Sequence, residues 1–114
     1  MPPAYNVARR LLLQFLASTA KADRVLRYGI VADTANLILS VMTDIAFADK
    51  YDIAPEDRVS FISTAQVKMD EVKVRIRVIK DARAIKTTGF SACTNLEKDV
   101  DYQLERWRET TLKK

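Results

Sequence analysis

The sequence predicts an all-α fold, with an up-down-up-down four-helix bundle as its architecture. Three observations support this prediction. Glycine and proline are scarce, at two and three of 114 residues, which leaves little turn chemistry for a β-rich fold. Apolar residues recur at helical spacing in four stretches, and the connections between these stretches are short. A chain of this length holds one core, so we expect residues 1–114 to form a single domain.

The first helix is expected over residues 4–19, where Leu11, Phe15 and Thr19 repeat at helical spacing. The second is expected over residues 24–49, with Asp23 as its N-cap. Gly29 lies inside the second helix, where glycine costs about 1 kcal/mol relative to alanine. We therefore expect close packing at Gly29 and no break in the helix.

The third and fourth helices are expected to follow two short connections. Pro55 suits the first position of the third helix, which should run to about Ile85. Residues 86–89 are expected to form the next turn. The start of the fourth helix is left open between caps at Thr88 or Ser91 and a capping box from residue 94 to residue 97, and its end is expected near residue 110.

The third helix is apolar on two opposite faces. The face expected to line the core comprises Ile62, Ala65, Met69, Val72, Ile76 and Ile79. The opposite face comprises Val67, Val74, Val78 and Ile85. A second apolar face needs a second partner, so we expect these four residues to form the interface of a homo-oligomer. The alternative is that one bundle covers both faces.

Basic residues flank these faces, and the chain carries a formal net charge of +4. The main cluster, expected to contact nucleic-acid phosphates, is Lys73, Arg75, Arg77, Lys80, Arg83 and Lys86, and a second group is Arg9, Arg10, Arg24 and Arg27. The alternative is a solvated face, partly offset by nearby carboxylates. No base-reading motif or aromatic stacking platform is visible, so binding should be through the backbone and sensitive to salt.

Several kinds of site are not expected. The chain has no histidine and one cysteine, Cys93, which excludes histidine-based catalysis and the usual zinc motifs. The acidic group of Glu97, Asp99, Asp101 and Glu105 is interpreted as a solvated face, so no metal, cofactor or enzymatic activity is expected. Cys93 and Trp107 are interpreted as packing residues. The apolar runs are short and no signal-peptide pattern is present, so no membrane segment and a cytoplasmic location are expected.

Diffuse motifs over residues 5–108 resemble one bacterial family. They are the Asp23–Arg24 pair opening the second helix, I-A-F-A at residues 45–48, V-I-K-D at residues 78–81, and the Leu104–Trp107 pair. The sequence resembles the four-helix-bundle proteins that include Avd, the accessory variability determinant of diversity-generating retroelements, and the proteins encoded by 23S rRNA intervening sequences. Gly29 lies five residues after Arg24, where relatives tend to have glycine at four, and Glu105 and Arg106 replace a glycine common before the tryptophan.

The resemblance implies a non-catalytic homopentamer with a basic surface. Such a protein binds RNA or DNA and a reverse transcriptase, and is needed for mutagenic copying of template RNA. The basic-flanked third helix agrees with this role. Two alternatives stay open: a helical oligomer that binds only protein, and a stand-alone RNA-binding bundle of the intervening-sequence type.

Overall fold

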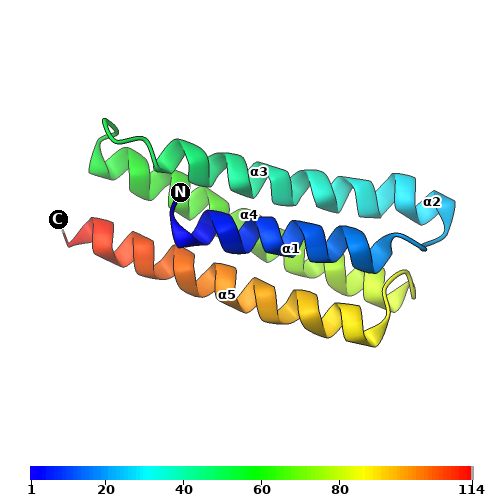
Figure 1. Ribbon diagram of the computed structural model, residues 1–114. Coiled ribbons are helices and arrows are strands. Elements are labelled where there is room, and N and C mark those ends of the chain that lie inside the picture. Colours follow the sequence, from blue (N-terminus) through cyan, green and yellow to red (C-terminus); the bar gives the residue numbers. More distant parts are fainter. Residues whose placement is uncertain (114) are drawn as a thin grey trace.

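Four helical rods, running alternately in opposite directions, make up the molecule (Figure 1). This computed structural model describes residues 1–113, and no strand occurs in that part of the chain. The first rod is α1, Pro3–Thr19, and the second joins α2, Arg24–Leu26, to η1, Arg27–Val31, and α3, Ala32–Ala48. The third is α4, Pro55–Asp81, and the fourth is α5, Thr87–Leu112. The prediction of an all-α helical bundle is confirmed.

The core lies along the axis of this bundle, which measures 47 × 22 × 20 Å. α1 packs on α3 and α5, and α4 packs on the same two helices from the other side. All six residues predicted for the inner face of the third helix are fully buried. Each helix therefore buries one apolar stripe, and burial of these stripes holds the four rods together.

α4 ends at Asp81, four residues before the predicted end at Ile85. The amide of Ala84 donates to the carbonyl of Ile79 at 3.0 Å, and the amide of Arg83 donates to that of Lys80 at 3.0 Å. This is the Schellman pattern, in which the residue after the helix adopts a left-handed conformation. Arg83 has a φ of 62°, a conformation usually signalled by glycine. The helix end was missed because an arginine occupies the position.

The prediction that residues 86–89 form a turn is wrong, because α5 begins at Thr87. None of the proposed caps operates: no side chain caps the helix, and residues 94–97 lie within it. Ile85 explains the early start. Its side chain is only 4% exposed and anchors the connection in the core, so the chain enters α5 directly from Lys86.

The packing at Gly29 differs from the prediction. Gly29 lies in the π-helical segment η1 with φ −99° and ψ −108°, and a Cβ there would meet no atom within 4 Å. The expectation of close packing at Gly29 is therefore wrong, because the position is a local distortion beside open space. Gly89 is the closely packed glycine, since a Cβ there would lie 2.7 Å from Oγ of Ser18.

The second rod, Arg24–Ala48, is long and apolar enough to cross a membrane by length and composition, with a mean hydropathy of 1.5 over 18 residues. In this structure it packs against α1 and α4 as one of the core rods. The core helix of a helical bundle passes the same test of length and composition.

Candidate nucleic-acid interface

The basic residues in the middle of α4 are held in ion pairs. Lys73 pairs with Asp101 of α5, and Nη2 of Arg75 lies 2.9 Å from Oε1 of Glu71. Burial acts to lower the pKa of Lys73, but the hydrogen bond to Asp101 and the charges of Asp101 and Asp70 outweigh it and raise the pKa. These pairs partly neutralise Lys73 and Arg75, so less of their charge is available to an anion than their sequence positions indicate.

The basic residues at the C-terminal end of α4 are different. In the described part of the chain, no carboxylate lies within 4.0 Å of Arg77, Lys80, Arg83 or Lys86. Arg77 and Lys80 instead lie 5.8 Å from the ring centroid of Phe90 in α5. Their charges therefore remain available to an anion.

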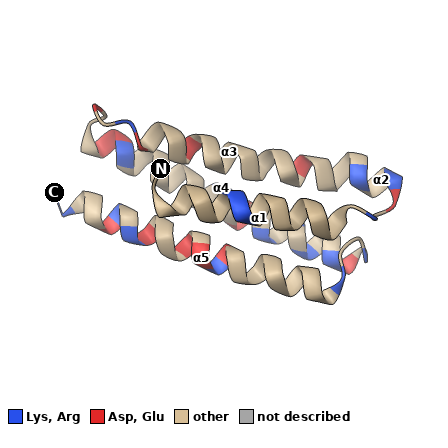
Figure 2. Ribbon diagram, in the orientation of Figure 1, with Lys and Arg blue, Asp and Glu red and all other residues tan. Residues whose placement is uncertain are grey.

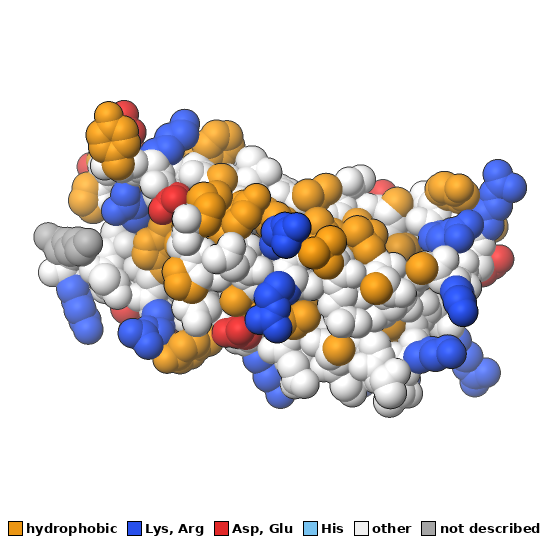
Figure 3. Space-filling model, viewed as in Figure 1, with side chains coloured by type: hydrophobic (Ala, Val, Ile, Leu, Met, Phe, Trp, Pro, Cys, Tyr) orange, Lys and Arg blue, Asp and Glu red, His pale blue; other side chains and the backbone are white. Residues whose placement is uncertain are grey.

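The fold brings a second set of cations to the same place. The α1–α2 connection and the α4–α5 connection lie at one end of the bundle, and Figure 2 shows basic residues on both connections. We call residues 20–28 and 77–88 the basic end. It holds seven basic residues, Lys21, Arg24, Arg27, Arg77, Lys80, Arg83 and Lys86, against two acidic ones, Asp23 and Asp81. In Figure 3 blue side chains gather at this end of the visible face.

The opposite end is closer to neutral. The α3–α4 connection and the start of α4, residues 49–58, carry four acidic and two basic residues. The last residues of α5 that lie there, 105–113, carry three basic and two acidic residues. The excess of positive charge is therefore concentrated at the basic end, which favours an anion there.

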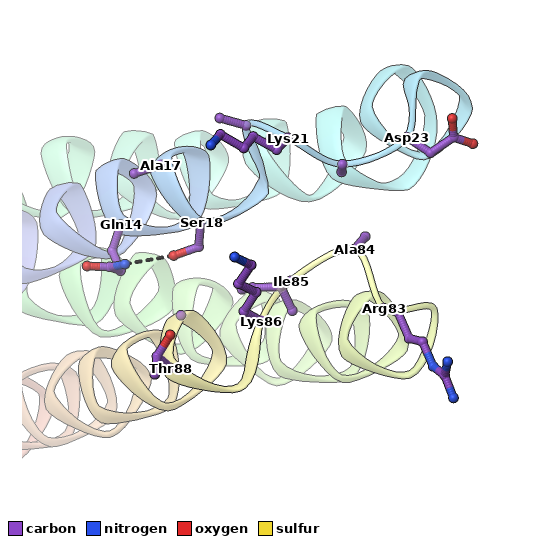
Figure 4. A pocket seen from close by; sticks show the side chains of 13 residues that line it. Gln14, Ala17, Ser18, Lys21, Asp23, Arg83, Ala84, Ile85, Lys86 and Thr88 are labelled. Carbon is purple, nitrogen blue, oxygen red and sulfur yellow. Dashed lines mark hydrogen bonds between the residues drawn. The ribbon is translucent and has the colours of Figure 1, made fainter.

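A groove of about 500 Å³ lies between the two connections of the basic end. Figure 4 shows Lys86 reaching toward Ser18 of α1, while Asp23 and Arg83 point away from the gap. Ser18 accepts a hydrogen bond of 2.7 Å from the Gln14 amide. The groove therefore has lysine and hydroxyl groups at its surface, and the one carboxylate in its lining is turned outward.

Of the second predicted group, the structure brings only Arg24 and Arg27 to the basic end. Arg27 is fixed there by its Nη1, which donates to the carbonyl of Ala20 at 3.1 Å. Arg9 and Arg10 are exposed near the middle of α1, about 15 Å from its end at 1.5 Å per residue. They lie outside the basic end.

Three residues of this surface were absent from the predicted set. Lys21 lies in the α1–α2 connection, and Phe90 underlies Arg77 and Lys80. Tyr28 is 70% exposed and has two arginines near its ring, although no stacking platform was expected. The spacing of Arg24, Arg27 and Tyr28 could have signalled this, because residues three or four apart share a helix face.

Three of the four residues predicted to form an oligomer interface are exposed. Val67, Val74 and Val78 are 69%, 64% and 48% exposed on the outer side of α4. The prediction for Ile85 is wrong, because this side chain is buried beyond the end of α4. Leu13 and Leu16 of α1 and Leu39 of α3 are also exposed, and we treat them as a second apolar surface.

The acidic group of α5 is not a solvated face throughout. Glu97 is only 7% exposed, and burial raises its pKa to about 7, with Lys73 lowering it and Asp101 raising it. It was missed because helical spacing does not show which carboxylate faces a neighbouring helix. Burial, with the Glu97 charge, raises the pKa of Cys93 to about 12. No set of three possible metal ligands occurs among residues 1–113.

The packing roles are as predicted. Cys93 is fully buried, and Trp107 is half-buried against the core. Two of the other acidic residues bridge to α4: Asp101 pairs with Lys73, and Glu105 accepts a hydrogen bond of 2.8 Å from Gln66. These contacts join α4 to α5.

No protein-family model matches the chain, and no curated protein matches it significantly.

Proposed function

We propose that this protein is a non-catalytic, nucleic-acid-binding accessory protein of a diversity-generating retroelement, acting in the cytoplasm as a homo-oligomer that docks a reverse transcriptase. The observation that carries the nucleic-acid part is the basic end, where residues 20–28 and 77–88 together hold seven basic residues against two acidic ones. The retroelement part is supported by the resemblance of residues 5–108 to the Avd family.

Binding would act mainly through phosphates. Arg77, Lys80 and Lys86 form no ion pair with a carboxylate in the described part of the chain. They can therefore bind a polyanion without first breaking such a pair. Each phosphate neutralised releases counterions, so affinity should fall steeply as salt rises. Several protomers in one assembly would engage one strand at several points and strengthen the binding.

The two exposed apolar surfaces support self-association. One is the Val67, Val74 and Val78 face of α4, and the other is the Leu13, Leu16 and Leu39 surface of α1 and α3. α1 and α4 do not pack on one another, so the surfaces lie on different sides of the bundle. Contact between two different surfaces generates a ring when the rotation closes, and the family resemblance favours a pentamer.

The same apolar surfaces also favour a second candidate, a helical module that binds only protein. A third, the stand-alone RNA-binding bundle, shares the basic end but has no polymerase partner. Binding of nucleic acid would distinguish the first candidate from the second, which binds only protein. Binding of a reverse transcriptase would distinguish the first candidate from the third.

Light scattering on the purified protein, alone and with short single-stranded RNA at low and high salt, tests the proposal. We expect an oligomer that binds RNA at low salt and releases it at high salt. The double variant Lys80→Glu with Lys86→Glu should lose at least about ten-fold in affinity. The matched control, Arg9→Glu with Arg10→Glu, makes the same change of charge in α1 and should lose less.

Absence of RNA binding to the wild type at low salt would favour the module that binds only protein. Equal losses in the two double variants would show that net charge, and not the basic end, governs binding. Co-purification of the tagged protein with the reverse transcriptase of such an element tests the retroelement role separately.

A further inference from the structure

Tyr28 stands out among the tyrosines. It lies in η1 at the basic end and is 70% exposed, so it contributes little to the core. The guanidinium carbons of Arg24 and Arg27 lie 5.7 and 5.6 Å from its ring centroid. The carbonyl of Ala20 holds Arg27 in place at 3.1 Å. An exposed ring thus has two cations close to it.

The other three tyrosines lack this combination. Tyr5 is half-buried and packs against the core. Tyr51 is 96% exposed but lies in the acidic α3–α4 connection. Tyr102 is 55% exposed in α5 with one cation, Arg106, 5.7 Å from its ring centroid. Among the tyrosines only Tyr28 joins an open ring to two arginines at the basic end.

Aromatic rings on a cationic surface distinguish single strands from duplexes. An unpaired base offers a free π-face that stacks on a side-chain ring, while nearby cations hold the adjoining phosphates. In a duplex the neighbouring base pairs cover these faces, so the same surface reaches only the phosphates. A surface with cations alone lacks this means of preferring a single strand.

We propose that Tyr28 stacks on an unpaired base while Arg24 and Arg27 bind the flanking phosphates, so that the basic end prefers single-stranded nucleic acid. This inference rests on the proposed nucleic-acid binding and adds the kind of strand that is bound. Lys21 and Lys86, in the adjoining groove, extend the phosphate path beyond the stacked base. The sequence of the strand is not read, because stacking accepts every base.

The test measures the affinity of the whole chain for one RNA sequence as a single strand and as a duplex, at low salt. Tyr28→Ala should weaken binding of the single strand by about five-fold or more. It should leave duplex binding nearly unchanged, because the arginines remain. Tyr28→Phe keeps the ring and should bind as the wild type does. Tyr102→Ala, which removes an exposed tyrosine with a cation neighbour elsewhere, should change neither affinity.

A direct readout of stacking comes from 2-aminopurine placed in the single strand. Its fluorescence should be quenched by the wild type and by Tyr28→Phe, and much less by Tyr28→Leu, which keeps an apolar side chain without a π-face. Circular dichroism confirms that each variant is helical. The stacking role is overturned if Tyr28→Ala binds the single strand as tightly as Tyr102→Ala does, or if it loses as much affinity for the duplex as for the single strand. Nucleic-acid binding would still stand in either case. If the wild type binds neither RNA, both proposals are overturned.

Discussion

Glu97 is the residue whose environment departs most from its sequence context. Carboxylates are rarely buried, yet Glu97 is only 7% exposed, and its charge interacts with Cys93 and with the ion pair of Lys73 and Asp101. Burial favours the neutral acid and raises the pKa from 4.5 to about 7. The folded protein therefore binds a proton at Glu97 that the unfolded chain has already released at mildly acidic pH.

This difference predicts a pH dependence of stability. A carboxyl group with a raised pKa contributes its full stability below 4.5 and loses it as the pH rises toward 7. We expect the contribution of Glu97 to the free energy of unfolding to fall by about 1–3 kcal/mol across that window. Cys93, with a pKa of about 12, does not titrate there.

The measurement is urea unfolding at several pH values between 4.5 and 8 for the wild type and Glu97→Gln. Glutamine keeps the shape but cannot ionise, so the difference between the two proteins isolates residue 97. The free energy of unfolding of Glu97→Gln, relative to that of the wild type, should rise by about 1–3 kcal/mol from pH 4.5 to 7. A difference that does not vary with pH would show that Glu97 titrates near its ordinary value.

Helices were predictable from the sequence where burial decides them. The stripe from Ile62 to Ile79 repeats at helical spacing through α4, and all six members are fully buried. The ends were less predictable because they depend on local backbone geometry. Arg83 occupies a left-handed position without the usual glycine, and α5 begins without a side-chain cap. Neither end therefore carries its usual residue signal.

The contact between α1 and α5 gives the second prediction. At Gly89 a Cβ would lie 2.7 Å from Oγ and 2.8 Å from Cβ of Ser18, and 3.3 Å from Cγ1 of Ile85. Gly89→Ala should therefore destabilise the fold by about 1–3 kcal/mol through overpacking. This loss exceeds the gain of up to about 1 kcal/mol that alanine brings inside a helix.

Thermal or urea unfolding checks this, and Ser18→Gly provides the control. In the Ser18→Gly background the two closest atoms are absent, so adding Gly89→Ala should cost little or should stabilise α5. A Gly89→Ala variant as stable as the wild type in the original background would show that α1 and α5 move apart without cost.

The basic end is formed by the packing of the whole molecule. This explains why the sequence predicted it only in part. The helical pattern identified the α4 cluster but could not show that Asp101 and Glu71 neutralise its middle. It also could not show that residues 20–28 lie beside residues 77–88, because that proximity comes from the antiparallel packing of rods. The position of Arg9 and Arg10 away from this end follows from the same packing.

Self-association and RNA affinity are coupled in the proposed function, and this yields the last prediction. Val74 lies near the centre of the exposed α4 face and is 64% exposed. Burying a lysine there without a partner is costly, so Val74→Lys should dissociate the oligomer. Although this change adds a positive charge, RNA affinity should fall by about ten-fold or more, because a single protomer loses multivalent contact. Leu112→Lys, a matched change at a 58% exposed site at the end of α5, should preserve both oligomer and affinity. Light scattering and RNA titration of the same samples test this prediction. If the oligomer persists in Val74→Lys, the interface lies elsewhere. If the variant is a monomer with higher RNA affinity, binding depends on charge alone.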